Sequence, residues 1–201
     1  MIIGVAHLGN QKQNNKKSGT AKYAAIVFLG TFFCACVMSL LSQFVLEQMD
    51  AVMIGFILLL IVILVGILFD IVGTAVAVAN QAPFNAKAAR KLPGAKKALN
   101  LTNRASQVAN ICNDVIGDIC GTVSGGISTA LVYVLVSSEG LLGLAASVIM
   151  AGLTAAVTVS GKAIGKSVAI NRADEIIFLV GQILDLPEMI RYHRRMKQKE
   201  Q

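Results

Sequence analysis

Four long apolar stretches alternate with polar segments along the chain. They cover about Tyr23–Leu46, Ala51–Ala79, Ala109–Val136 and Leu141–Ser160. A helix that crosses a bilayer needs roughly 20 mostly apolar residues, and each stretch reaches that length. The pattern therefore predicts an all-α integral membrane protein with four transmembrane helices, of which the third is the most polar.

Two of the polar segments also carry a helical pattern. Residues 83–107 predict short interfacial helices that are interrupted at Pro93-Gly94, because this dipeptide is typical of a turn. Asp174–Ile190 places its apolar residues mostly on one side and begins with an acidic pair. This pattern is typical of an amphipathic helix lying on a membrane surface, with its acids favourably placed at the helix N-terminus.

The basic residues lie in only three places. All 18 lysines and arginines precede the first stretch, fall between the second and third, or follow the fourth. The turns 47–50 and 137–140 have none. Cytoplasmic loops carry such an excess, so we expect a multi-pass protein of the cell membrane with both termini in the cytoplasm. The basic segments would attract anionic lipid headgroups, so the net charge of +7 requires no nucleic-acid partner.

Composition agrees with a membrane protein. Only 14% of the residues are charged, against about a quarter in soluble domains, and the mean hydropathy is +0.69. The chain contains no HExxH motif, no Ser/His/Asp set and no phosphate-binding glycine loop. We therefore expect a protein that is not an enzyme and binds no nucleotide.

Several polar groups fall inside the predicted spans. Asp70 lies near the end of the second span, and Asn113 lies early in the third. Carboxylates inside a membrane are costly and mark functional sites by default. Two further sets recur every four residues along the third span and so share a helix face: Asn110, Asp114, Asp118 and Thr122 form one, and Gly117, Gly121 and Gly125 form the other. The glycine row predicts close helix packing, with Gly152, Ala156 and Ser160 as a matching surface.

Three motifs together resemble the transmembrane domain of the CNNM/CorC family of magnesium transporters. That family carries "FxSGxE" at the end of one helix, "GNN" early in the next and "GExxPKS" after the last. The chain has "LFDIVGTAVAVAN", with Asp70 at the serine position and Gly73 at the glutamate position. It has Cys112-Asn113-Asp114 at the second motif. It has "GKAIGKSVAINRADE" at the third, where Lys162 and Gly165 replace the glutamate and the proline.

The resemblance implies a domain organisation. Residues 1–22 form a basic cytoplasmic segment, 23–50 an additional transmembrane helix, 51–190 the CNNM-like domain and 191–201 a basic tail. Family members dimerise through this domain, so we expect a homodimer with the glycine row as a candidate contact. The family's nucleotide-binding CBS domains have no counterpart within these residues.

The resemblance also implies Mg²⁺ as the transported ion, through a diverged site built from Asp70, Asn113, Asp114 and Asp118. Lys162 stands where the family has a metal-binding glutamate, and a charged ammonium repels a cation. Two alternatives follow. Either Lys162 turns away and the carboxylates bind a divalent cation, or an Asp70–Lys162 pair replaces the metal in a non-transporting scaffold or regulatory protein.

Overall fold

A computed structural model describes residues 26–37, 39–40, 52–135 and 141–199 of the chain. All secondary structure in these residues is helical. A short apolar helix, Ile26–Val37, comes first. It is followed by α2 (Val52–Val78), α3 (Gln81–Ala89), α4 (Ala95–Asn103), α5 (Ala105–Asn110), the π-helix η1 (Ile111–Ile116), α6 (Gly117–Leu135), α7 (Leu141–Asn171) and α8 (Ala173–Lys199).

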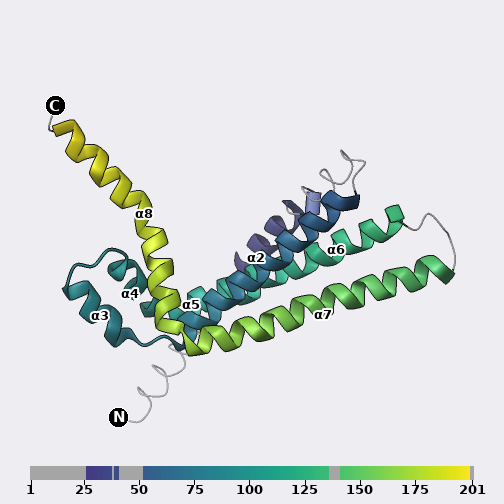
Figure 1. The fold of residues 1–201 in the computed structure, drawn as a ribbon, viewed down its shortest axis with the longest axis horizontal. Helices are drawn as coiled ribbons and strands as arrows, with labels where there is room; N and C mark the ends of the chain where they lie inside the picture. Colours follow the sequence, from purple (N-terminus) through teal and green to yellow (C-terminus); the bar gives the residue numbers. More distant parts are fainter. Residues whose placement is uncertain (1–25, 38, 41–51, 136–140, 200–201) are drawn as a thin grey trace, which may run out of the picture.

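The long helices form a bundle. α2, α6 and α7 all contact one another and run side by side in Figure 1. α5, η1 and α6 together make one span, Ala105–Leu135, so the described residues contain 3 helices that are long and apolar enough to cross a membrane. The chain thus has the architecture of a multi-pass helical membrane protein.

The bundle core lies mainly between α2 and α6. Its buried side chains are Leu59, Val62, Ile63, Ile119, Cys120, Val123, Ile127 and Leu131. Gly66 lets the two helices approach, because a Cβ there would lie 2.9 Å from the Cβ of Cys120. The outward sides of α2 and α7 carry many exposed large apolar residues, as expected where a helix faces lipid.

Short helices gather at one end of the bundle. We call this region the head, made of α3, α4 and residues 173–186 of α8 (Figure 1). Phe84, Ala98 and Ile177 are buried there together with Ala75 and Val76 of α2. The side chain of Asn80 caps α3 by accepting the N–H of Ala82. The head therefore packs onto the end of α2 as part of the same fold.

The turn between α3 and α4 depends on Gly94. Its φ is +79°, which favours glycine, and a Cβ there would lie 2.5 Å from the backbone N of Gln182 on α8. The N–H of Gly94 donates to Asp185 at 2.8 Å. Gly181 of α8 lies equally close to this turn, since a Cβ added to Gly181 would lie 2.6 Å from the carbonyl oxygen of Gly94. This close contact fixes α8 against α4.

Most of the predicted helices are present in the described residues. The second, third and fourth apolar stretches are confirmed as helices long enough to cross a membrane, at Val52–Val78, Ala105–Leu135 and Leu141–Asn171. The two short helices on either side of Pro93-Gly94 and the helix that starts at the acidic pair Asp174-Glu175 are also confirmed. The helix of the fourth stretch, α7, is longer than the predicted span, because it continues beyond Ser160 to Asn171. Lys162 and Lys166 are compatible with a helix interior, so their charge marks no helix end.

The first predicted span is described only in part. The structure shows an apolar helix at Ile26–Val37, and the remaining residues of Tyr23–Leu46 lie largely outside the described ranges. The two lysine-free turns, 47–50 and 137–140, lie outside them as well.

Candidate cation site

Asp70 is a buried acid within a candidate membrane span. It lies on α2, eight residues before Val78, which is about 12 Å along the helix axis. The residue is only 3% exposed, and its Oδ2 has no hydrogen-bond partner. The nearest cation is the Nζ of Lys166 on α7, at 3.9 Å from Oδ2. This separation makes an ion pair but exceeds hydrogen-bond distance.

Asn113 supplies a second buried oxygen. Its Oδ1 is buried without a hydrogen-bond partner and points at α2 beside Gly73. A Cβ at Gly73 would overlap this oxygen and would lie 2.7 Å from the Cγ of Asn113. Gly73 is three residues after Asp70, so the two share one side of α2. Asn113 Oδ1 therefore lies at the interface between α2 and η1, one turn along α2 from Asp70, whose Oδ2 faces Lys166 of α7.

The π-helix explains how Asn113 reaches this position. In Ile111–Ile116 the hydrogen bonds span five residues, as in the bond from the N–H of Gly117 to the carbonyl of Cys112. A π segment changes the direction of the side chains that follow it and frequently occurs at functional sites. Here Cys112 is buried and Asn113 is partly buried, whereas Asp114 is exposed. The π segment was not predicted from the sequence.

Lys162 does not pair with Asp70. Its Nζ lies on the α6 side of α7, 3.4 Å from the position that a Cβ of Gly117 would occupy. The predicted Asp70–Lys162 pair was therefore wrong about the lysine, since Lys166 is the partner.

The register of α7 against α2 accounts for this difference. Gly161 faces Ile67, and Gly165 faces Ile71. Lys166 is therefore level with Asp70, whereas Lys162 lies one turn farther from the head. Lys166 also extends toward solvent, with its side chain 53% exposed.

Asp114 and Asp118 lie apart from the two orphan oxygens. Both are exposed, on the side of the span that carries the exposed residues Thr122 and Thr129. The hydroxyls of these threonines donate to carbonyls of their own helix. The four residues named by the resemblance thus separate into a buried pair, Asp70 with Asn113, and an exposed pair, Asp114 with Asp118.

The glycine row is not a contact between α6 and α7. Gly117 faces Lys162, but a Cβ on Gly121, Gly125 or Gly152 would meet nothing within 4 Å. The contact between these helices uses hydroxyls instead: Ser128 and Thr154 are buried, with their oxygens 2.8 Å apart. Of the row, Gly117 is buried beside Lys162, whereas Gly121 and Gly125 have open space beside them.

The donor set restricts which cation could bind. In the described residues, no group of three or more His, Cys, Asp or Glu side chains is placed to hold a metal ion. One carboxylate and one amide oxygen fall short of the three or four Cys, His or Asp/Glu ligands of protein zinc sites. They suit Mg²⁺, which keeps several waters and binds through one or two carboxylates. The chemical types of the two orphan oxygens, a carboxylate and an amide, are thus those of hard-cation ligands.

Comparisons with protein-family models, curated proteins and solved structures gave no match to this chain.

Proposed function

We propose that this chain is a divalent-cation transporter of the CNNM/CorC type, which binds Mg²⁺ at Asp70 and Asn113. The observation that carries the proposal is the pair of buried oxygens, Asp70 Oδ2 and Asn113 Oδ1, that have no hydrogen-bond partner. Buried polar atoms nearly always form a hydrogen bond. A buried polar atom that forms none lowers the stability of the fold by about 1–3 kcal/mol. Two of them on facing helices are typical of a site that a ligand completes.

Each residue of the site has a distinct role in this proposal. Asp70 supplies the negative charge, and Asn113 supplies a neutral oxygen that fixes the position of the cargo. Gly73 leaves the space in which Asn113 can reach α2. Lys166 neutralises Asp70 when no cation is bound, and its half-exposed, flexible stem lets the ammonium withdraw toward solvent.

The distribution of charge supports an orientation. By the positive-inside rule, two groups of basic residues belong to the cytoplasmic side. One group lies at 87–104, in and beside the head, and the other follows the acidic start of α8. With this orientation, and with Tyr23–Leu46 as a fourth span, the protein is a multi-pass protein of the cell membrane whose termini are both cytoplasmic. In this orientation Asp70 lies near the cytoplasmic end of α2, eight residues before Val78.

A homodimer belongs to the same proposal. The exposed side of the α5–η1–α6 span carries Asp114, Asp118 and Thr122, and lipid cannot solvate carboxylates well. The open glycines at 121 and 125 would let a second copy approach closely along this side.

A second function is favoured by the ion pair. If Lys166 holds Asp70 permanently, the pair replaces the metal, and the chain is a non-transporting scaffold or regulatory membrane protein. The 3.9 Å separation and the exposure of Lys166 favour a pair that can open. A pair this exposed contributes at most about 1 kcal/mol, which bound Mg²⁺ could exceed.

Thermal unfolding of the purified chain in detergent separates the two functions. For the transporter we expect saturable stabilisation by millimolar MgCl₂ that is absent with NaCl of equal ionic strength. Asp70→Asn should remove the stabilisation because it removes the only charge of the buried pair. Asp114→Asn is the matched control, since Asp114 is exposed and should leave the Mg²⁺ response in place. If the unsubstituted protein gains no stability from Mg²⁺, the scaffold function is supported instead.

A further inference from the structure

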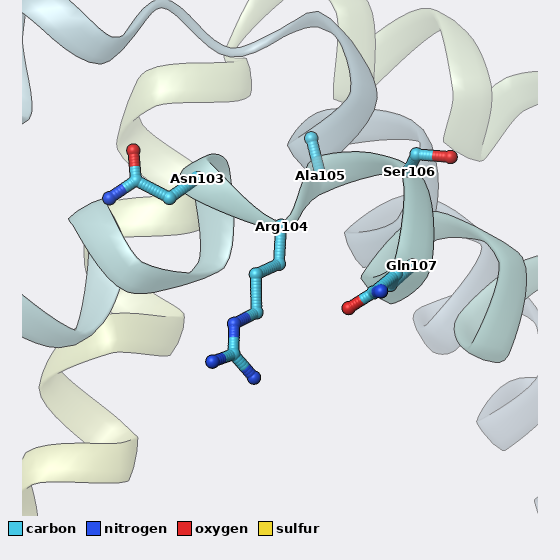
Figure 2. Close-up of a pocket in the computed structure, with 5 residues that line it drawn as sticks. All are labelled: Asn103, Arg104, Ala105, Ser106 and Gln107. Atoms are coloured by element: carbon cyan, nitrogen blue, oxygen red, sulfur yellow. The ribbon is translucent and has the colours of Figure 1, made fainter. Parts of the chain in front are cut away.

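A second polar feature lies at the junction of α4 and α5, outside the Asp70 site. Asn103, Arg104, Ala105, Ser106 and Gln107 line an open cavity of about 570 Å³. Figure 2 shows the side chains of Arg104 and Gln107 extending to the same side of the turn, whereas Asn103 and Ser106 point to opposite flanks. The lining offers a guanidinium, two amides and a hydroxyl but no carboxylate. Such a set of donors suits an anion.

The charge around this cavity is not neutralised by neighbouring acids. Residues 81–110 contain no Asp or Glu. Two acids of α8 face the head, but Asp174 accepts the N–H of Asn80 at 2.9 Å, and Asp185 accepts that of Gly94 at 2.8 Å. Arg104 forms no ion pair with any residue in the described ranges. Its guanidinium is therefore available to a ligand.

The position of the cavity, at the end of a candidate span, indicates a lipid as its ligand. Arg104 directly precedes Ala105, the first residue of a candidate span, and a basic side chain at a span end lies among the headgroups. Gln107 lies one turn before Ile111, which is on the same side of the helix and 47% exposed. A cavity of donors is thus continuous with apolar surface that runs into the membrane.

We propose that this cavity binds the phosphate of an anionic phospholipid. The Arg104 guanidinium donates to two phosphate oxygens in the bidentate geometry that arginine favours. The Gln107 carboxamide donates to a third oxygen or to the headgroup, and an acyl chain lies over Ile111. Free phosphate has the same anionic chemistry, but it gains nothing from Ile111.

Native mass spectrometry of the full chain in neutral detergent tests the proposal. The protein is mixed with phosphatidylglycerol and phosphatidylcholine of the same chain length, and the fraction carrying each lipid is measured. We expect preferential retention of phosphatidylglycerol. Arg104→Gln should weaken its binding about fivefold, the effect of about 1 kcal/mol for one basic residue near a membrane surface. Arg104→Lys should restore part of the loss, because lysine keeps the charge but lacks the fork.

Arg90→Gln is the matched control. Arg90 is also an exposed arginine of the head, but it does not line the cavity, so its loss should change phosphatidylglycerol binding much less. Equal losses for Arg90→Gln and Arg104→Gln would overturn the assignment, because they would show diffuse attraction to the whole head. If Arg104→Gln does not fold, Gln107→Ala provides the second variant, and unchanged binding in it contradicts the proposal.

A competition experiment distinguishes a phospholipid from free phosphate as the ligand of the cavity. Inorganic phosphate at the same concentration as the lipid should neither displace phosphatidylglycerol nor raise the melting temperature of the protein. Displacement at that concentration would assign the cavity to free phosphate and overturn the lipid proposal. All of these measurements are independent of Mg²⁺, so their outcome is distinct from that of the proposed transport function.

Discussion

The bundle has a half far from the head and a half near it, and both contain similar small residues. The two halves differ in whether their buried polar atoms have hydrogen-bond partners. In the far half, the buried hydroxyls of Ser128 and Thr154 are 2.8 Å apart, and Ser124 donates to a carbonyl of its own helix. In the near half, buried oxygens of Asp70 and Asn113 have no hydrogen-bond partner. The far half therefore has the features of helix packing, and the near half has those of a binding site.

Space around glycine differs in the same way. Gly73 in the near half is needed because Asn113 occupies the place of its Cβ, whereas Gly125 in the far half has open space around it. A glycine thus allows two helices to come close together at position 73, whereas at position 125 it lies beside open space. Contacts, and not residue type, decide which glycines belong to the site.

The largest effect should come from filling the space at Gly73. Gly73→Ala places a methyl group on the Asn113 side chain and near the Cβ of Cys112. Overpacking of this kind costs about 1–3 kcal/mol, so thermal unfolding in detergent should occur at a clearly lower temperature. Gly152→Ala is the control and should leave stability unchanged or raise it, since a Cβ there meets nothing within 4 Å and alanine favours a helix. Similar changes for both variants would remove the distinction between the two halves.

An intermediate effect should follow from removing the competing ammonium. Lys166→Met keeps the stem but deletes the charge 3.9 Å from Asp70 Oδ2. Because the side chain is half exposed, the charge contributes about 1 kcal/mol, and the apparent affinity for Mg²⁺ should rise about fivefold. A titration of melting temperature against MgCl₂ measures this change. Lys162→Met is the control; a larger rise in that variant would restore Lys162 as the residue that opposes the cation.

The smallest effect should come from the satisfied hydroxyls of the far half. Ser128→Ala breaks the bond with Thr154 and should cost about 0.6 kcal/mol, the average for such bonds between membrane helices. The response to Mg²⁺ should be unchanged, because no residue of the near half moves. Thr129→Ala, which removes an exposed hydroxyl bonded to its own helix, should cost less. Loss of the Mg²⁺ response in Ser128→Ala would contradict the assignment of the far half to packing.

The helices themselves could be predicted because apolar length and turn residues are local signals. Asp70 and Asn113 could also be singled out, since a polar group in an apolar span is conspicuous in the sequence. The choice between Lys162 and Lys166 could not be predicted, because it depends on the register of α7 against α2. The exposure of Asp114 could not be predicted either, because it depends on which side of the span packs against the other helices.

The sequence contains a pattern that indicates the role of Gly73. A glycine three residues after a buried acid, within a long apolar helix, indicates that another group approaches the same side. The identity of that group, Asn113, required the packing of two spans about 40 residues apart in the chain. The sequence could therefore indicate where a site lies but not which atoms complete it.

The most direct test is Mg²⁺ flux into vesicles that contain the purified chain and an enclosed Mg²⁺-sensitive dye. The account predicts flux above that of empty vesicles for the unsubstituted chain and for Asp114→Asn. It predicts the empty-vesicle rate for Asp70→Asn, whose buried charge is gone. Equal flux in the unsubstituted chain and Asp70→Asn, or flux no faster than in empty vesicles for both, would contradict a cation path through the Asp70 site.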